Sequence, residues 1–306
     1  MRVAIIGAGA MGGLLGFYLA DNAEVLLVDG WAEHVTAINT GGLHCEVHGV
    51  EQVRPAQAVS DPAQAAPVDV ALVLVKAHQT AWAAGCAAAL LGPEGVAYTL
   101  QNGVGNRELL AATLGAARAG QGVTALGATL LGPGRVRHAG IGATHFGLAP
   151  QPQLATALAD LFQRCGLPAE VSAEIDALVW GKLLVNVGIN ALSALLRVPN
   201  GALADLPQAR TLLTDAVREA ATVAAARGIQ LPYADPVAHA LAVARATAAN
   251  RSSMLQDVLR GGHSEVGTIN GAIVREGRRL GVPTPINSML LALVQALEES
   301  AAWRVG

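Results

Sequence analysis

The order of apolar and polar positions predicts strands alternating with helices in the first half of the chain. The predicted strands are 2–6, 24–28, 68–75, 96–100 and several short ones over 122–148, which include a Gly-Pro-Gly turn at 132–134. Apolar helices are expected over 14–20 and 153–164. This alternation is typical of a parallel sheet covered by helices, and the short strands are expected to close that sheet.

After residue 173 the pattern is almost wholly helical. The predicted helices are 173–196, 207–227, 236–247, 264–280 and 285–303. No linker rich in Pro, Gly or Ser separates the halves. We therefore predict an α/β domain over 1–172 and an all-helical domain over 173–306, with a shared interface and the active site in the cleft between them.

The segment 177–196 carries a single charge, Lys182, in an otherwise apolar helix. At about 100° per residue, Lys182, Asn186, Asn190 and Ser193 fall within a sector of roughly 80°, which we call the polar stripe. Because buried polar groups need partners, the polar stripe predicts a cavity that holds a polar ligand. The alternative is that Lys182 snorkels from a helix end and the asparagines satisfy neighbouring backbone.

Composition indicates a globular protein. The 306 residues are 52% hydrophobic and 14% charged, so a large core can form. The apolar runs are interrupted too early to span a membrane, and Gly7 and Gly9 follow only four apolar residues, which does not match a signal peptide. We expect a cytoplasmic protein without a membrane partner.

The net charge of −3 and the scarcity of aromatic residues argue against nucleic acid as a partner. The three cysteines, Cys45, Cys86 and Cys165, do not have the spacing of metal ligands or of a redox pair, so we expect reduced core thiols and no metal.

A glycine-rich turn, GAGAMG at 7–12, lies between the first strand and the first helix. Gly7 would make the tight turn, Gly9 would let backbone approach a pyrophosphate, and Gly12 would permit close helix packing. An acid, Asp29, ends the second strand twenty residues beyond Gly9, where an adenosine ribose is expected. This context predicts a Rossmann dinucleotide-binding domain.

Asp29 also bears on the choice of cofactor. A carboxylate accepts hydrogen bonds from both ribose hydroxyls but repels a 2′-phosphate, so NAD(H) is favoured over NADP(H). No Lys or Arg occurs from Asp29 through Val53. The alternative is that Asp29 merely ends a strand.

Two polar clusters follow predicted parallel strands, and ligands of such sheets bind at that edge. They are Lys76 to Gln79 and Gln101 to Gly103. A surface lysine and an Asn-Gly turn are the alternatives. Further along the chain, Ser253 with Gln256 and Ser264 with Glu265 match helix-start patterns.

Taken together, five motifs resemble the ketopantoate reductase (2-dehydropantoate 2-reductase) family over nearly the whole chain. They are GAGAMG at 7–12, VKAHQT at 75–80, QNG at 101–103, WGKLLVNVGINAL at 180–192, and RSSMLQD with HSEVGTINGAIV at 251–257 and 263–274. The resemblance implies reduction of a branched 2-oxo acid to a 2-hydroxy acid.

The resemblance also assigns roles to individual residues. It makes Lys182 the general acid and Asn186, Asn190 and Ser253 the substrate ligands. The residues it assigns to the cofactor are Gly7, Gly9, Met11, Gly12, Asp29, Lys76, Gln79, Asn102 and Glu265, with Asn102 and Glu265 at the nicotinamide end. It is also compatible with a homodimer.

The chain departs from the family after the second strand. Many members carry an Arg-Gly pair that serves the phosphate of NADPH, whereas this chain has Asp29-Gly30. Reduction of 2-dehydropantoate to pantoate is the leading hypothesis, and an NAD-dependent D-2-hydroxyacid dehydrogenase of the same family is the alternative. A noncatalytic dinucleotide sensor is a third hypothesis, although it would not require the complete polar stripe.

Overall fold

The computed structural model describes residues 1–303, which divide into two compact units. Unit 1 comprises Met1–Gln101 and Asn106–Ile175, and unit 2 comprises Asn102–Gly105 and the residues from Asp176 onward. The change of unit thus falls after Ile175 rather than after residue 172, and a short segment of the first half packs with the second. The predicted α/β domain followed by a helical domain is confirmed.

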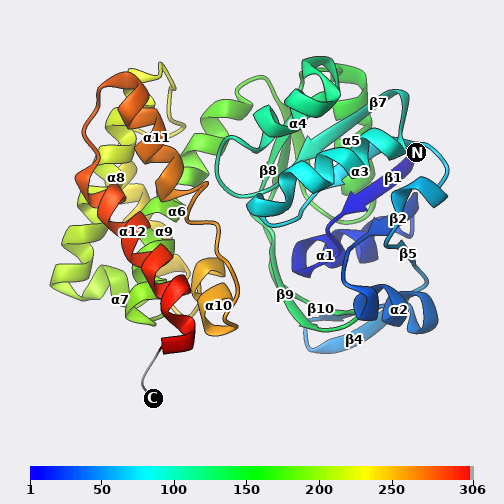
Figure 1. Cartoon of the computed structure of the whole chain (residues 1–306), viewed down its shortest axis with the longest axis horizontal. Helices are drawn as coiled ribbons and strands as arrows, with labels where there is room; N and C mark the ends of the chain where they lie inside the picture. The colour runs from blue at the N-terminus through cyan, green and yellow to red at the C-terminus, as the bar shows by residue number, and fades with distance from the viewer. Residues whose placement is uncertain (304–306) are drawn as a thin grey trace. The chain divides into compact units, whose positions relative to one another are not determined.

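Unit 1 is built on an eight-stranded sheet with the strand order β12-β11-β8-β7-β6-β1-β2-β5. Figure 1 labels five of these strands, β1, β2, β5, β7 and β8. The strands are β1 Arg2–Ile6, β2 Glu24–Val28, β5 Gln57–Val59, β6 Val68–Val73, β7 Leu91–Thr99, β8 Ala119–Thr124, β11 Thr144–Gly147 and β12 Ala169–Ser172. Neighbours pair in parallel except β11 with β8. Because β1 lies between β2 and β6, the chain reverses its winding direction at β1, where doubly wound sheets bind ligands.

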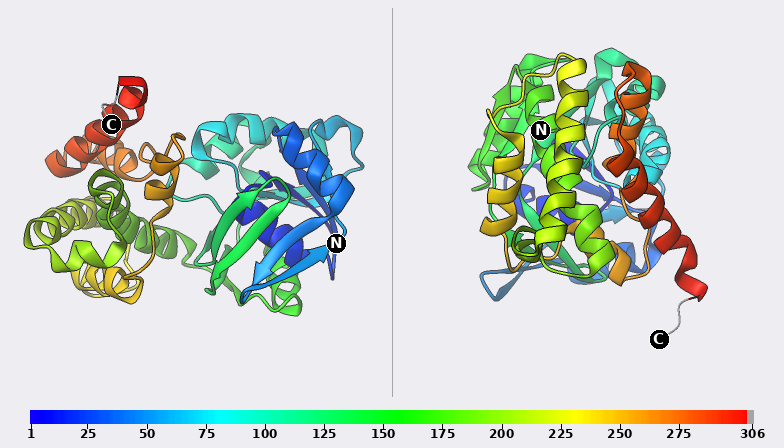
Figure 2. Two further views of the ribbon diagram at one scale, coloured as in Figure 1. Left: turned by 90° about the horizontal axis from the view of Figure 1, so that it is seen from below. Right: turned by 90° about the vertical axis from the view of Figure 1, so that its left-hand side faces the viewer.

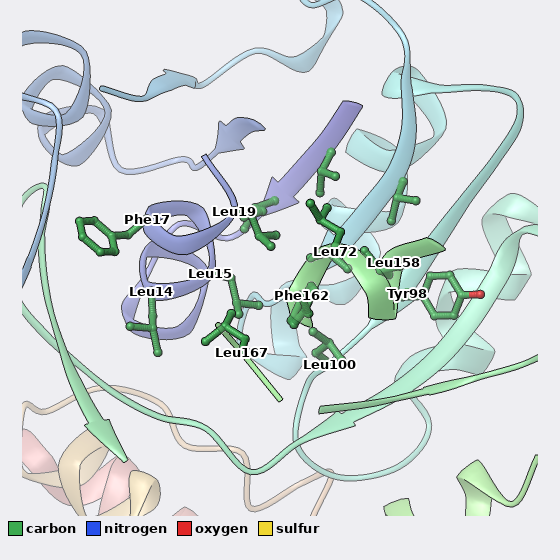
Figure 3. Close-up of a cluster of buried hydrophobic side chains, with 14 of the residues drawn as sticks. Leu14, Leu15, Phe17, Leu19, Leu72, Tyr98, Leu100, Leu158, Phe162 and Leu167 are labelled. Atoms are coloured by element: carbon green, nitrogen blue, oxygen red, sulfur yellow. The ribbon is translucent and has the colours of Figure 1, made fainter. Parts of the chain in front are cut away.

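Both faces of this sheet are buried, which explains the nearly continuous apolar runs of its strands. On β1, Val3 and Ile5 enter one core with helices α1 Ala10–Leu19 and α5 Pro152–Arg164. Figure 3 shows Leu14 and Leu15 of α1 and Phe162 of α5 in this core. The alternate residue Ile6 enters a second core with α3 Thr80–Leu90 and α4 Asn106–Leu114. The two-residue period of a strand thus divides β1 between two cores.

A separate four-stranded sheet, β4-β3-β10-β9, corrects the expectation that all the short strands close the main sheet. Its strands are β3 Leu43–Val47, β4 Val50–Arg54, β9 Gly127–Gly132 and β10 Arg135–Gly140, and Figure 2 shows them side by side. The hairpin that turns at 132–134 pairs with β3, whose strand character went unpredicted. Along the chain, α2 Ala32–Gly41 connects β2 of the main sheet to β3 of the small sheet.

Unit 2 is helical, and its core surrounds α6. Its helices are α6 Ile175–Leu196, α7 Asn200–Asp205, α8 Pro207–Ala226, α9 Pro236–Ala246, α10 Ser253–Leu259, α11 Asn270–Leu280 and α12 Pro285–Glu299. By length and composition α6 could cross a membrane, but 72% of its most apolar window is buried inside the fold, as in the central helix of a folded domain. The helix predicted from 264 begins only at Asn270, because the chain bends at 265 and forms a turn over 266–269.

Candidate functional site

The glycine-rich turn of unit 1 owes its shape to contacts that only glycine permits. Gly7 has φ +95°, and a Cβ atom there would lie 2.6 Å from the backbone nitrogen of Val75. A Cβ on Gly12 would lie 1.8 Å from the carbonyl oxygen of Gly7, so α1 can approach the turn only without a side chain at this position. These contacts match the roles predicted for Gly7 and Gly12.

Gly9 differs from both, because a Cβ built on it would meet no atom within 4 Å. It is the N-cap of α1, and no side chain caps that helix end. Met11, half-buried, lies in the first turn. Open space beside free backbone N–H groups suits a pyrophosphate, so the residues present fit the diphosphate of a dinucleotide.

Asp29 holds the glycine-rich turn through its carboxylate. Oδ2 accepts a hydrogen bond from the backbone N–H of Ala8 at 2.8 Å, and Oδ1 accepts one from the N–H of Trp31 at 2.9 Å. The carboxylate is therefore fixed beside the turn rather than turned away from it. Each oxygen keeps lone-pair capacity for a further donor, such as a ribose hydroxyl.

The first polar cluster lies beside the same turn. Lys76 is half-buried and follows Val75, whose backbone abuts Gly7, while the N–H of exposed Gln79 donates to the carbonyl of Lys76 at 2.8 Å. Gln101, to which no role was assigned, is buried and donates through Nε2 to the carbonyl of Val75 at 2.9 Å. The sequence signal for this bond was the position of Gln101 directly after a buried strand, at the edge where the first polar cluster also lies.

In unit 2, three predicted residues from distant parts of the chain form one hydrogen-bonded series. Nζ of Lys182 donates to Oδ1 of Asn102 at 2.8 Å, and Nδ2 of Asn102 donates to Oε2 of Glu265 at 3.0 Å. We call Lys182, Asn102 and Glu265 the polar triad. The amide of Asn102 is thereby fixed in orientation, since its oxygen faces an ammonium and its nitrogen faces a carboxylate.

The environment of the polar triad changes the acidity of its lysine. Burial lowers the pKa of Lys182 from 10.5 to about 8, and the negative charge of Glu265 opposes this change in part. The side chain of Glu265 is itself buried. Lys182 thus holds its proton at neutral pH and releases it far more readily than a solvated lysine.

Asn102 lies between Lys182 and Glu265 because the segment Asn102–Gly105 packs against residues that follow Glu265. The N–H of Val104 donates to the carbonyl of Thr268 at 3.2 Å. Gly103 has φ +85°, and a Cβ there would lie 2.2 Å from the same carbonyl oxygen. Only glycine fits this approach, so the Asn-Gly pair is more than a surface turn.

All four residues of the polar stripe lie on α6, but their surroundings differ. Asn186 is half-buried and Asn190 is buried, one helical turn apart. The hydroxyl of Ser193 bonds instead to the carbonyl of Asn190 at 3.0 Å and to the Ser252 hydroxyl at 2.6 Å. The expectation that Ser193 faces a cavity is therefore wrong, because its hydroxyl links two parts of the unit.

Ser252, rather than Ser253, caps α10. Its hydroxyl oxygen accepts the N–H of Leu255 at 3.0 Å, so the capping pattern is displaced by one residue. Ser253, the first residue of α10, is half-buried, and its hydroxyl is not part of the cap. The Ser193–Ser252 bond fixes the start of α10 to the same helix that carries Asn190.

The two glycines of α6, Gly181 and Gly188, leave room for side chains of neighbouring segments. A Cβ on Gly188 would lie 2.8 Å from Val217 of α8, and one on Gly181 would lie 3.0 Å from Pro232. These contacts bury the side of the helix that is poor in polar groups. Among residues 1–303, no group of three or more His, Cys, Asp or Glu side chains could hold a metal.

Comparison with known proteins gives two family matches. Residues 3–151 match "Ketopantoate reductase PanE/ApbA", and residues 174–298 match "Ketopantoate reductase PanE/ApbA C terminal". A 2-dehydropantoate 2-reductase from Halobacterium salinarum is 37% identical over 96% of this chain and 98% of its own length. The resemblance predicted from the motifs is confirmed.

Solved structures agree with these matches. A ketopantoate reductase from Ralstonia eutropha JMP134 has a TM-score of 0.90 and 35% identity over 98% of this chain and 99% of its own. A D-mandelate dehydrogenase with NADH and anilino(oxo)acetate has a TM-score of 0.90 and 32% identity over 98% and 99%.

Proposed function

Because this chain belongs to the ketopantoate reductase family, we propose that it reduces a branched 2-oxo acid to a 2-hydroxy acid, with 2-dehydropantoate as the leading substrate. The chain is an oxidoreductase that uses a nicotinamide cofactor. The relatives reported above are all reductases or dehydrogenases, so the noncatalytic alternative gains no support from them.

The polar triad is the observation that carries this proposal. Reduction of a ketone places negative charge on its oxygen, and an ammonium held at that oxygen stabilises the charge and supplies the proton. With a pKa of about 8, Lys182 is protonated at neutral pH and close to the acidity that suits a general acid. Asn102 positions the ammonium, and Glu265 orients Asn102.

The substrate itself would be held by the amides and the hydroxyl near the triad. Asn186 and Asn190 lie one and two helical turns beyond Lys182 on α6, and the link between Ser193 and Ser252 fixes Ser253 to the same helix. Amide N–H groups and a serine hydroxyl can donate to a carboxylate and orient the neighbouring carbonyl. This arrangement supports the assignment of Asn186, Asn190 and Ser253 as substrate ligands.

The glycine-rich turn supports the cofactor assignment. Gly7, Gly9, Met11 and Gly12 would hold the diphosphate, and Lys76 and Gln79 would flank the adenosine portion. When bound, a reduced nicotinamide supplies the hydride that converts the carbonyl carbon into an alcohol carbon. The proton that completes the alcohol leaves Nζ of Lys182, which regains one from solvent.

We further propose that NADH is preferred to NADPH. Two backbone N–H groups fix the Asp29 carboxylate beside the glycine-rich turn, where it can accept both ribose hydroxyls but would repel a 2′-phosphate. NADH should bind at least about tenfold more tightly than NADPH, and Asp29→Asn should narrow that gap because it removes the charge. Tighter binding of NADPH by the wild-type protein would contradict this assignment.

Two observations favour a second candidate, an NAD-dependent D-2-hydroxyacid dehydrogenase. Asp29-Gly30 stands where the family's Arg-Gly pair is expected, and the D-mandelate dehydrogenase with NADH is as similar in structure as the ketopantoate reductase. A panel of 2-oxo acids, including 2-dehydropantoate and benzoylformate, separates the two candidates by kcat/KM with each cofactor. The cytoplasmic location and the homodimer stay predictions.

A further inference from the structure

Beyond the residues already assigned, unit 1 carries a stacked pair of rings next to Asp29. The indole of Trp31 and the imidazole of His34 lie nearly parallel, with an interplanar angle of 6° and ring centroids 5.1 Å apart. His34 is fully buried, whereas Trp31 is 40% exposed. The imidazole therefore backs one face of the indole while much of Trp31 stays open.

His34 also ties this pair to the glycine-rich turn. The backbone N–H of Gly134 donates to its Nδ1 at 2.9 Å, so the hydrogen of the neutral ring lies on Nε2. Nε2 then donates to the carbonyl of Ala8 at 2.9 Å. Ala8 is thus held through its carbonyl by His34 and through its N–H by Asp29.

The backbone is open both at the turn and next to Trp31 in the chain. A Cβ on Gly9 or on Gly30 would meet no atom within 4 Å, and Gly30 lies between Asp29 and Trp31 in the chain. The N–H of Trp31 donates to Asp29, which fixes the backbone that carries the indole relative to the carboxylate. Diphosphate, ribose and base follow one another along a dinucleotide in the same order as Gly9, Asp29 and Trp31.

We propose that the exposed face of Trp31, backed by His34, is the surface on which the adenine base of the cofactor stacks. This inference rests on the proposed placement of the ribose at Asp29. Stacking between an aromatic side chain and a base contributes appreciably to affinity and does not depend on hydrogen bonds to the base edge. The rigid backing lowers the cost of ordering the indole.

ADP-ribose and reduced nicotinamide mononucleotide separate the two ends of the cofactor in a calorimetric titration. Trp31→Ala should raise the Kd of ADP-ribose about tenfold and leave that of the mononucleotide, which lacks adenine, unchanged. Trp31→Phe, which keeps a ring, should recover most of the affinity. Trp82→Ala is the matched control, since Trp82 lies on α3 and is 41% exposed.

An unchanged Kd of ADP-ribose in Trp31→Ala would overturn the inference. An equal loss for both ligands would overturn it too, because Trp31 would then act through the shape of the glycine-rich turn. A third ligand, ADP-ribose with a 2′-phosphate, tests the proposal on Asp29 separately from the proposal on Trp31. If the wild-type protein prefers the phosphorylated ligand, the preference for NADH fails. Stacking is still supported if Trp31→Ala weakens the binding of ADP-ribose and of its 2′-phosphorylated form but leaves the mononucleotide unchanged, since the first two ligands carry adenine and the third does not.

Discussion

The glycine-rich turn of unit 1 and the polar triad of unit 2 are built on opposite principles. The turn is made of backbone atoms, and its glycines are defined by the side chains that they lack. The triad is made of side chains from three separate segments, held by hydrogen bonds that join residues up to 163 positions apart. A backbone site can therefore be read from local spacing, whereas a side-chain site depends on the tertiary fold.

The largest effect should follow removal of the ammonium from the polar triad. Lys182→Ala is expected to lower kcat by at least about 100-fold, because both the proton and the stabilising charge are lost. Steady-state kinetics with the best 2-oxo acid measures this change. The Kd of the cofactor's ADP-ribose portion should not change, and near-normal kcat in the variant would remove Lys182 from the mechanism.

Two glycines of the turn separate a role in packing, at Gly12, from a role in binding the cofactor, at Gly9. Gly12→Ala would place a methyl group 1.8 Å from the carbonyl of Gly7, so the free energy of unfolding should fall by about 1–3 kcal/mol and cofactor binding should be lost. Gly9→Ala meets open space, so thermal stability should be nearly unchanged while the Kd of NADH rises about tenfold or more. Thermal denaturation and titration of each variant measure the two quantities.

The reverse pattern would contradict the roles given to these glycines. If Gly9→Ala unfolds the protein and Gly12→Ala binds NADH normally, the turn does not hold the diphosphate in the way proposed. A variant with unchanged stability and unchanged Kd at Gly9 would show that the space beside it is not used by the cofactor.

The sequence predicted the first site better than the second. Strand, turn and helix lie within thirty residues, so spacing alone places Gly7, Gly9, Gly12 and Asp29. The bond between Lys182 and Asn102 could not be predicted this way, because it joins α6 to a loop 80 positions earlier. Periodicity revealed the polar stripe but did not separate Ser193, whose partner Ser252 lies on another element.

The missed strands have a similar explanation. β3 and β4 are only five residues long each, and the pairing of β3 with β10 joins segments about 90 positions apart. His34 was overlooked because its two partners, Ala8 and Gly134, lie 26 and 100 positions away. Local pattern carries no information about such contacts.

Two asparagines of unit 2 separate a binding role from a structural one. Asn186→Ala should raise the KM of the oxo acid by an amount equal to about 1–3 kcal/mol, because a substrate acceptor loses its donor. Asn287→Ala removes a buried amide that donates to the carbonyl of Ala216 at 3.0 Å and to Glu219 at 2.8 Å. Asn287→Ala should lower thermal stability and leave the KM of the oxo acid unchanged. If Asn186→Ala also changes thermal stability but not KM, Asn186 has a structural role rather than a binding role.

Near neutral pH the pH dependence should be the smallest effect, because the change in rate begins only close to pH 8, and it bears directly on the polar triad. Reduction requires protonated Lys182, so kcat/KM should be level below pH 8 and fall about tenfold per unit above it, since burial lowers the pKa to about 8. Oxidation of the hydroxy acid requires the neutral amine, so its rate should instead rise toward pH 8.

The free energy of unfolding should change with pH in a different way. Between pH 8 and 10.5 the unfolded state binds more protons at this lysine than the folded state does, so the contribution of Lys182 to stability rises with pH. A fall in reduction rate alongside retained folding therefore identifies the titration with the triad, whereas a profile that is level to pH 10 would mean that Lys182 keeps its ordinary acidity and acts as a fixed charge alone.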